Sequence, residues 1–338
     1  MKSRVSRIVF WSFLALLAAA SIAFSLGSGS IDIPPRGIAD ALISRVSGNA
    51  PAGRGELVVV ELRLPRTVAA LLVGGALAAA GVLFQGLFRN PLVEPYTLGV
   101  SGGAAIGISL GIVLGGPDVM ALRPLLGFAG GVAAIAVVWK IAGKGEGTNR
   151  LLLVGVMVSF ISSALIMSLL AVAGLDRFRP VLYWTMGSLA GTDPVLVAIL
   201  GGLEAVCLVF ALSRAWKLNA LGAGEEIAAG LGVDLRRERL LVFAVGALLA
   251  GGAVAVAGVI GFVGLLVPHA VRHFTGLDHR RLLPAAFLAG GTFLVLCDTL
   301  ARTLFADRGI QLPVGAVTGL SGGVIFLMIL AGKNGRER

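Results

Sequence analysis

Arg63–Ala104 reads RLPRTVAALLVGGALAAAGVLFQGLFRNPLVEPYTLGVSGGA. Its first part, together with the preceding leucine, is an apolar run over Leu62–Gly86 that is long enough to cross a bilayer as one helix. The run ends at Arg89-Asn90-Pro91, a combination typical of a tight turn. A second apolar run, Leu92–Leu114, follows at once and is interrupted by Pro95. The stretch therefore predicts two consecutive membrane-spanning helices, the second of them irregular near its start.

The composition of the whole chain agrees with a membrane protein. Of its 338 residues, 57% are hydrophobic and 14% are charged, and the mean hydropathy is +0.94. A soluble domain carries roughly 25% charged residues. The 49 glycines suit membrane helices that approach one another closely. The net charge of +10 does not indicate a nucleic-acid partner, because the basic residues lie in short clusters between apolar runs.

Ten apolar runs are candidates for spanning helices. The first has a basic flank like that of a cleaved signal peptide, but its length favours a retained helix. The eighth is too short to cross straight and ends at Pro268, as in the broken helices that surround transport pathways. The ten runs are Ile8–Leu26, Leu62–Gly86, Leu92–Leu114, Leu122–Ile141, Leu151–Ala173, Val195–Ala215, Leu240–Gly258, Val259–His269, Arg280–Leu304 and Ile310–Ala331.

The chain is expected to be a single transmembrane domain, residues 1–338, made of two inverted halves. GALAAAG at Gly75–Gly81 recurs as GALLAGG at Gly246–Gly252, in spans of opposite direction. This weak echo suggests approximate halves 1–190 and 191–338, the repeat pattern of many transporters. Between the first two spans, the pattern Ile38, Leu42 and Val46 after a Pro-Pro pair predicts a helix on the membrane surface.

Lysine and arginine set the expected orientation. When the spans alternate from an inner N-terminus, most of the 28 basic residues fall on the inner side. Both termini are then cytoplasmic, in the bacterial inner membrane. The polar segment Trp216–Arg239 also lies inside, whereas Arg63 and Arg66 face outward.

Trp216–Arg239, WKLNALGAGEEIAAGLGVDLRRER, is far more polar than the runs on either side. Within it, Glu225–Leu231 can form a short helix with Ile227 and Leu231 on one face. Glycines bracket that piece, as they do at helix ends. Two interpretations remain open from the pattern: a surface for a partner protein, or an ordinary solvated loop.

Catalytic motifs are weak or missing. Gly99–Gly103 matches the G-x-S-x-G of hydrolases, but it lies in a span, where close helix packing explains its glycines better. His269 and His273 have the spacing of a zinc site but read HAVRH, without the glutamate that a zinc protease needs. No stretch matches G-x-x-x-x-G-K-[ST], so any ATP-driven work belongs to another subunit. We therefore expect a membrane protein that is not an enzyme and holds no cofactor.

Two carboxylates are expected inside spans, Glu204 and Asp298, and buried charges of this kind are candidates for function. Arg302 follows Asp298 by one helical turn, so an ordinary ion pair near the outer surface is the alternative. A self-sufficient secondary transporter or channel, the rival class of function, would need more such groups. Cys207 and Cys297 both lie in apolar runs and predict buried thiols without a disulfide.

The motifs together resemble those of one family, the permease subunits of ABC importers for iron–siderophore complexes, haem and vitamin B12. The resemblance covers nearly the whole chain, in order, and does not select a substrate within the family. Its motifs are R-x-P-R at Arg63–Arg66, Q-x-x-x-x-NPL-x-x-P-x-x-LG at Gln85–Gly99, WTMGS at Trp184–Ser188, LNAL at Leu218–Leu221 with Gly224–Gly232, GFVG at Gly261–Gly264 with Pro268-His269, and LPVG at Leu312–Gly315.

The resemblance implies an all-α integral membrane protein with the type II ABC importer permease fold. It implies a dimer, of two identical or two similar permease subunits, with the translocation path at their interface. Two cytoplasmic ATPase subunits, which bind ATP and Mg²⁺, would dock on one side and a periplasmic substrate-binding protein on the other. Transport would be by alternating access, with an iron complex as the first candidate for the cargo.

The resemblance also implies three groups of site residues. The first group would pair with acidic residues of the binding protein: Arg63, Arg66 and Arg302. The second would form the coupling surface for the ATPase: Leu218, Asn219, Leu221, Gly224, Glu225, Ala228, Leu231 and Gly232. The third would shape the translocation region: Gln85, Asn90, Pro91, Pro95, Gly99, Pro268, Pro313 and Gly315.

Overall fold

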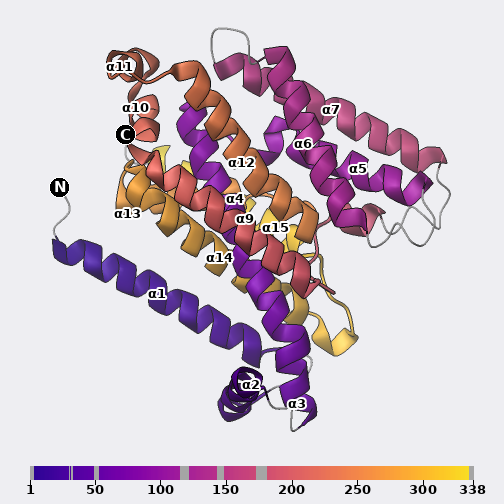
Figure 1. Cartoon of the computed structure of the whole chain (residues 1–338). Helices are drawn as coiled ribbons and strands as arrows, with labels where there is room; N and C mark the ends of the chain where they lie inside the picture. The colour runs from indigo at the N-terminus through magenta and orange to yellow at the C-terminus, as the bar shows by residue number, and fades with distance from the viewer. Residues whose placement is uncertain are drawn as a thin grey trace.

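The protein is described here by a computed structural model that covers residues 4–29, 31, 33–48, 53–114, 122–142, 148–172 and 181–334. Within these ranges the regular structure is entirely helical (Figure 1). α10 and α11 lie at one end of the bundle, and α2 and α3 lie at the other.

Each predicted span corresponds to a helix. Seven helices are long and apolar enough to cross a membrane: α1 (Arg4–Gly27), the helix that includes α4 (Leu64–Phe88), α6 (Arg123–Ala142), α7 (Thr148–Val172), α9 (Pro194–Ser213), α12 (Leu235–Ala257) and α14 (His279–Thr303). Three further helices complete the predicted ten: α5 (Val100–Leu114), α13 (Val263–Thr275) and α15 (Val314–Asn334).

The remaining helical elements are short. They are α2 (Pro35–Ser47), α3 (Arg54–Leu57), the π-helix η1 (Val58–Arg63), the 3₁₀-helices η2 (Pro95–Leu98) and η4 (Ala306–Arg308), α10 (Ala215–Ala223) and α11 (Glu225–Gly230). Of these, α3 and η1 form the start of the second span, and the others lie between spans.

The second span starts earlier than its sequence suggests. A continuous helix of 35 residues runs over Arg54–Phe88 and passes through the π-helix Val58–Arg63 into α4. Pro65 has no N–H, and its ring would crowd the preceding turn of a regular α-helix. The wider π turn lies directly before this proline, and such insertions are a common cause of local distortion in helices. The expectation that Arg63 and Arg66 stand at a helix start was therefore wrong.

α4 forms the centre of the bundle. Its buried residues include Val73, Leu77 and Phe84, and it packs against α9, α12, α13 and α14. The contact with α14 depends on two glycines: a Cβ on Gly74 would lie 2.3 Å from the carbonyl oxygen of Gly290. Small residues of this kind let membrane helices approach backbone to backbone.

The outer helices expose apolar side chains instead of burying them. Phe13 on α1, Phe160 on α7 and Val206 on α9 are all more than half exposed. An apolar surface of this extent is stable only when something other than water covers it. The arrangement is that of a bundle surrounded by lipid.

The helix contacts relate the two predicted halves. If the second span (α4) is equivalent to the seventh (α12), then α13 is equivalent to α5 and α14 to α6. The α4–α14 contact of one half then corresponds to the α12–α6 contact of the other, and the α13–α14 contact corresponds to the α5–α6 contact. All four contacts are present. The division at residue 190 stays a prediction.

α2 has the expected helical structure but only part of the expected apolar face. Ile38 and Leu42 pack on a small cluster that includes Ala41 and Val59, whereas Val46 is fully exposed. The two cysteines agree with expectation: Cys207 and Cys297 are both buried, and neither forms a disulfide.

Candidate functional site

The loop before α13 is held by side chains from the segment that follows α4. The Glu94 carboxylate accepts the backbone N–H of Phe262, and the Tyr96 hydroxyl accepts that of Ile260 at 3.0 Å. Phe262 has a φ of 69°, a conformation that L-residues adopt rarely and only under constraint. Glu94 thus stabilises the break between α12 and α13.

Gln85 and Pro268 meet at the same break. Because Pro268 has no N–H, the carbonyl oxygen of Gly264, four residues earlier, has no helical donor. The Gln85 Nε2 group donates to this oxygen at 3.1 Å and to the carbonyl of Leu265 at 3.3 Å. Its Oε1 accepts from Arg272 Nη2 at 3.0 Å. The buried Gln85 amide therefore joins α4 to residues of α13 on both sides of Pro268.

The predicted turn after α4 adopts the geometry that its residues favour. Arg89 is left-handed with φ 49°, and the Asn90 Oδ1 atom accepts the Leu92 N–H at 2.9 Å. A side-chain turn of this type is characteristic of asparagine. Pro91 is exposed on the turn, and Pro95 is buried at the start of η2. Gly99 follows with φ 87° and ends that short helix.

The Trp184–Ser188 motif meets both Pro313-Gly315 and the end of α12. A Cβ on Gly315 would lie 2.3 Å from the carbonyl oxygen of Met186 and 2.9 Å from that of Val259. The Ser188 N–H donates to the Ala257 carbonyl at 2.8 Å. Two motifs that are far apart in sequence therefore meet each other and the end of α12, beside the beginning of α15.

The predicted coupling segment is divided between a buried part and an exposed part. Leu218, Leu221 and Ala228 are buried. On the short helix α11, Ile227 is 53% exposed, and Leu231 directly after it is 61% exposed. Ile227 and Leu231 are therefore the exposed apolar residues that a partner could contact. Ile227 was not among the predicted site residues.

Ion pairs attach α11 to the bundle. Glu225 pairs with Arg239 on α12 and lies 3.8 Å from Arg89 at the end of α4. Gly224, at φ 142°, and Gly232, at φ 77°, adopt backbone conformations that favour glycine. α11 also packs within its own chain, because the Ala228 side chain is in the main core.

Asn219 has an internal role at the neighbouring turn. Its Nδ2 donates to Asp278 at 2.9 Å, and its Oδ1 accepts the His279 N–H at 2.9 Å. These bonds fix the first turn of α14 to α10. Donation from Asn219 is the main reason why the pKa of Asp278 is below its usual value.

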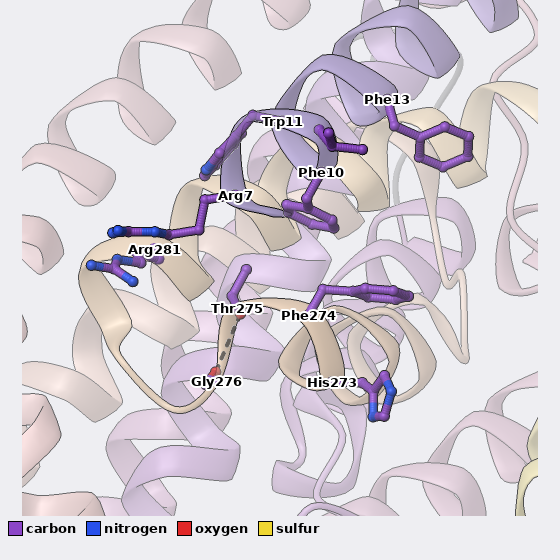
Figure 2. A pocket seen from close by; sticks show the side chains of 10 residues that line it. Arg7, Phe10, Trp11, Phe13, His273, Phe274, Thr275, Gly276 and Arg281 are labelled. Atoms are coloured by element: carbon purple, nitrogen blue, oxygen red, sulfur yellow. Dashed lines mark hydrogen bonds between the residues drawn. The ribbon is translucent and has the colours of Figure 1, made fainter. Parts of the chain in front are cut away.

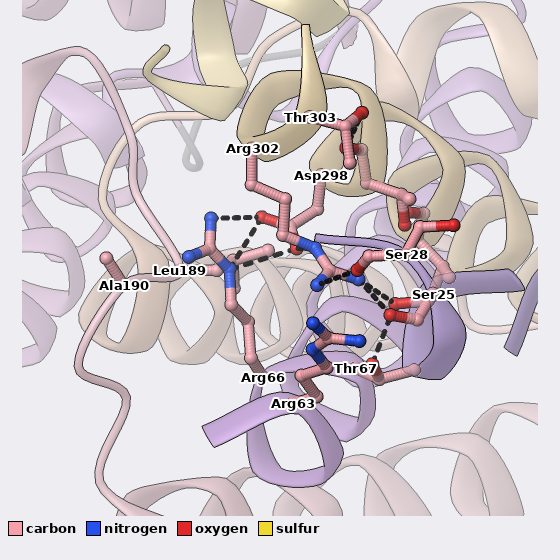
Figure 3. A network of polar contacts seen from close by, with 12 residues as sticks. Ser25, Ser28, Arg63, Arg66, Thr67, Leu189, Ala190, Asp298, Arg302 and Thr303 are labelled. Carbon is pink, nitrogen blue, oxygen red and sulfur yellow. Dashed lines mark hydrogen bonds and ion pairs between the residues drawn. The ribbon is translucent and has the colours of Figure 1, made fainter. Parts of the chain in front are cut away.

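The opposite end of the bundle holds the three predicted docking arginines (Figure 3). Arg63 is buried, and its guanidinium donates to the carbonyl oxygens of Leu26 and Gly27 at 2.7 and 2.8 Å. Arg302 is also buried, and it donates to the Ser28 carbonyl and to Ser25 Oγ, each at 2.8 Å. Both arginines thus tie the end of α1 to α4 and α14.

Arg66 forms the strongest ion pair of this cluster. Its Nη2 atom lies 2.8 Å from Asp298 Oδ1, and its Nε atom lies 3.0 Å from both carboxylate oxygens. Such two-pronged contacts are the strong form of the arginine–carboxylate pair. Arg302 Nε lies 3.7 Å from the same carboxylate, so the Asp298–Arg302 ion pair that the sequence offered as the alternative to a functional buried charge is present.

These contacts correct the picture of three exposed charges. The exposed fractions are 14% for the Arg66 side chain and 1% for that of Asp298. Arg66 also reaches Gln311 at 3.1 Å and lines a cavity of about 400 Å³ at this end. Arg66 is therefore the docking candidate with the most accessible side chain, and a docking role for any of the three stays a prediction.

The remaining predicted charge, Glu204 on α9, is buried. Neither carboxylate oxygen has a hydrogen-bond partner among the described residues. Across the same part of the chain, no group of three or more His, Cys, Asp or Glu side chains forms a candidate metal site, and this includes His269 and His273 on α13.

A comparison with protein families decides the identity of this bundle. The model of the FecCD transport family matches residues 16–332. The chain belongs to this family.

Curated FecCD relatives match over most of their length. The hemin transport system permease protein HmuU of Yersinia pestis is 40% identical, with 80% of this chain and 82% of the relative covered. The cobalamin import system permease protein BtuC of Halobacterium salinarum is 42% identical, with 83% and 75% covered. The uncharacterised ABC transporter permease protein YvrB of Bacillus subtilis is 37% identical, with 96% and 92% covered.

A solved structure shares the FecCD fold throughout. It is described as an inward-facing conformation of a metal-chelate type ABC transporter. The TM-score is 0.81 and the sequence identity is 30%, with 96% of this chain and 99% of that chain covered. The predicted all-α importer-permease fold and the family resemblance are thereby confirmed.

Proposed function

We propose that this FecCD chain is the membrane subunit of an importer that moves an iron–siderophore, haem or cobalamin-type complex from the periplasm to the cytoplasm. Two of the relatives named above are permease proteins of hemin transport and cobalamin import systems, and both cargoes are metal chelates. Two copies of the chain form the transporter, and the path lies at their interface. Alternating access moves the cargo, and ATP is hydrolysed on a separate subunit.

The observation that carries this proposal is an exposed apolar pair, Ile227 on α11 and Leu231 directly after it. The Glu225–Arg239 ion pair and the buried Ala228 attach this short helix to the bundle. A mobile loop would dissipate a push from a partner, whereas a helix attached in this way transmits it to α12. The surface therefore suits an ATPase that moves during its cycle.

The breaks next to α13 suit the motion that the proposal requires. Conformational change in membrane proteins concentrates where helices are interrupted and their backbone is satisfied by side chains. Glu94 and Gln85 supply such contacts, and Arg272 extends them toward the α10–α11 end. A displacement of α10–α11 would reach the break through the α13–α14 turn, which Asn219 bonds, and then through the Arg272–Gln85 hydrogen bond.

The same end of the bundle is assigned to the cytoplasm. The N-terminal part of α1, the α13–α14 turn and α10–α11 are close together at this end. The excess of lysine and arginine in these segments supports a cytoplasmic location. The arginine cluster on α4 and α14 then faces the periplasm, where a substrate-binding protein would deliver the cargo.

A self-sufficient secondary transporter is the rival. It would require titratable groups along a path. Of the two carboxylates predicted inside spans, Asp298 is neutralised by Arg66 and Arg302, and only Glu204 is without such a partner among the described residues. The rival is therefore less well supported.

Reconstitution tests the proposal. The chain would be placed in proteoliposomes with and without an ATPase and a substrate-binding protein encoded beside it, and uptake of haem, cobalamin and a ferric siderophore would be measured. Uptake that needs both partners and ATP supports the importer. Uptake by the chain alone, driven by a proton or sodium gradient, would show a secondary transporter.

Exchange of the binding protein tests where selectivity resides. The spans show no cluster of candidate metal ligands within the described residues, so the permease has no evident means of coordinating one metal complex. A binding protein of different specificity should therefore change the imported chelate. Unchanged cargo after the exchange would show that the permease itself selects.

A further inference from the structure

The N-terminal part of α1 and the α13–α14 turn enclose a cavity of about 540 Å³ (Figure 2). It lies at the end of the bundle that carries α10 and α11, beside the outward surface of α1. The residues that line it are Arg7, Val9, Phe10, Trp11, Phe13, His273, Phe274, Thr275, Gly276 and Arg281.

One part of this cavity is apolar and aromatic. Phe10 stacks on Phe274 with ring centroids 5.4 Å apart, and Trp11 meets Phe10 edge to face. Phe13 and Phe274 are nevertheless more than half exposed. Aromatic side chains of this kind gather at the boundary between the hydrocarbon core and the headgroups of a bilayer. The exposed rings therefore offer a surface for an acyl chain.

The other part of the cavity is cationic. Figure 2 shows the guanidinium groups of Arg7 and Arg281 on one side of the cavity, with the rings of Phe10, Phe13 and Phe274 on the other. No acidic residue precedes Asp32 in the chain. The carboxylate that Arg281 approaches is that of Asp278, at 3.9 Å, and both side chains are well exposed. A wide, exposed pair of this kind leaves most of the positive charge available.

We propose that this cavity binds an anionic phospholipid of the cytoplasmic leaflet. Its phosphate would lie between Arg7 and Arg281, and one acyl chain would lie along Phe10, Phe13 and Phe274. Basic pockets between spanning helices on the cytoplasmic side are suited to anionic headgroups. A soluble acidic peptide would match the arginines but not the lipid-facing rings, so a phospholipid accounts for both halves of the cavity. The bound lipid would fasten the start of α1 to the α13–α14 turn.

Trp11 supplies the measurement, because it lies in the wall of the cavity. Full-length protein is placed in phosphatidylcholine nanodiscs that contain a minor fraction of acyl-brominated phosphatidylglycerol or of acyl-brominated phosphatidylcholine. The signal of Trp11 is the difference between wild type and Trp11→Phe. We expect brominated phosphatidylglycerol to quench this signal at much lower mole fraction than brominated phosphatidylcholine does.

The double variant Arg7→Gln/Arg281→Gln tests the charges. A basic residue near a membrane surface strengthens the binding of anionic lipid roughly fivefold, so loss of both should reduce the preference about 25-fold. Arg236→Gln/Arg237→Gln removes the same charge from exposed positions at the start of α12 and should keep the preference. Both pairs are exposed, so neither is expected to unfold the protein.

Four results would overturn the proposal. Equal quenching by the two lipids would show an ordinary lipid-facing surface, and no quenching by either would show that protein, such as a second copy, covers the cavity. Reversal of quenching by excess inorganic phosphate would show a site for a free anion. An equal loss in the two double variants would show that only the overall charge matters.

Discussion

The Gln85 amide donates to the Gly264 carbonyl oxygen at 3.1 Å, and that oxygen is the one that Pro268 leaves without its helical N–H. The proline that kinks α13 and the glutamine that satisfies the freed acceptor lie on different helices. In a membrane interior, an unsatisfied carbonyl costs several kcal/mol, so the two residues are expected to act as a pair.

A double-mutant cycle tests this relationship. Gln85→Leu should lower the free energy of unfolding by about 1–3 kcal/mol, because it leaves buried groups without partners. In a Pro268→Ala background the restored N–H can bond Gly264, so the same change should cost about 1 kcal/mol less. Thermal unfolding in one detergent measures all four variants. Strict additivity would contradict the pairing, and Gln311→Leu at the exposed end of the Arg66 contact is a control.

Asp298→Asn should destabilise the outer end of the bundle by about 3–5 kcal/mol. The change leaves Arg66 and Arg302 close together without a counter-charge, and loss of one partner of a buried pair has a cost of that size. Asp307→Asn removes the same charge at an exposed position of that end and should be near neutral. Denaturation followed by Trp fluorescence compares the two variants. Similar stabilities would show that the pair contributes little.

We predict that Arg66 contributes to docking of the binding protein, whereas Arg63 contributes to the stability of the fold. Arg66→Gln should weaken capture of the binding protein and flatten its salt dependence, as expected for a charge at an interface rim. Arg63→Gln should instead lower the unfolding temperature, because the Arg63 donors bond carbonyl oxygens within the chain. Capture across a salt series and thermal unfolding are measured for both. A folded Arg63→Gln protein with reduced capture and an unaltered melting temperature would reverse the assignment.

Leu231→Asp and Ile227→Asp should uncouple ATP hydrolysis from transport without loss of stability. Both side chains are exposed, so the changes act on the partner surface, where a central apolar contact contributes about 1–2 kcal/mol, or roughly 5- to 30-fold in affinity. Val46→Asp, which is fully exposed at the other end, is the matched control. ATPase co-purification and ATP-dependent uptake are the measurements. Full association and transport in both α11 variants would refute the coupling surface.

Asn219→Leu should weaken the start of α14 by about 1 kcal/mol, the usual cost of a lost cap contact. It also removes the main group that lowers the pKa of Asp278. Since that pKa is lower in the folded state, its stabilising effect is present above the unfolded pKa and is lost as the pH falls through the folded one. The stability difference between wild type and variant should therefore shrink in acid. A pH series of melting temperatures checks this, and a constant difference would exclude the linkage.

Much of the fold was predictable from local properties of the sequence. The length of an apolar run is decided within the run, so all ten spans and the broken α13 could be located before any contact was known. The turn at Asn90 followed from the chemistry of one side chain. The glycines around α11 likewise marked its ends, since two of them adopt backbone angles that favour glycine.

The environment of each charged side chain was decided only by the tertiary structure. Arg63 has the same sequence signature whether it faces water or the carbonyl oxygens at the end of α1, because those acceptors lie 36 or 37 residues away along the chain. The carboxylate for Arg66 lies 232 residues away. The local sequence pattern does not show which distant segment packs against a given side chain. A charged side chain that is removed from water needs a partner, so the distant segment determines whether an arginine is available for docking or is bonded within the chain.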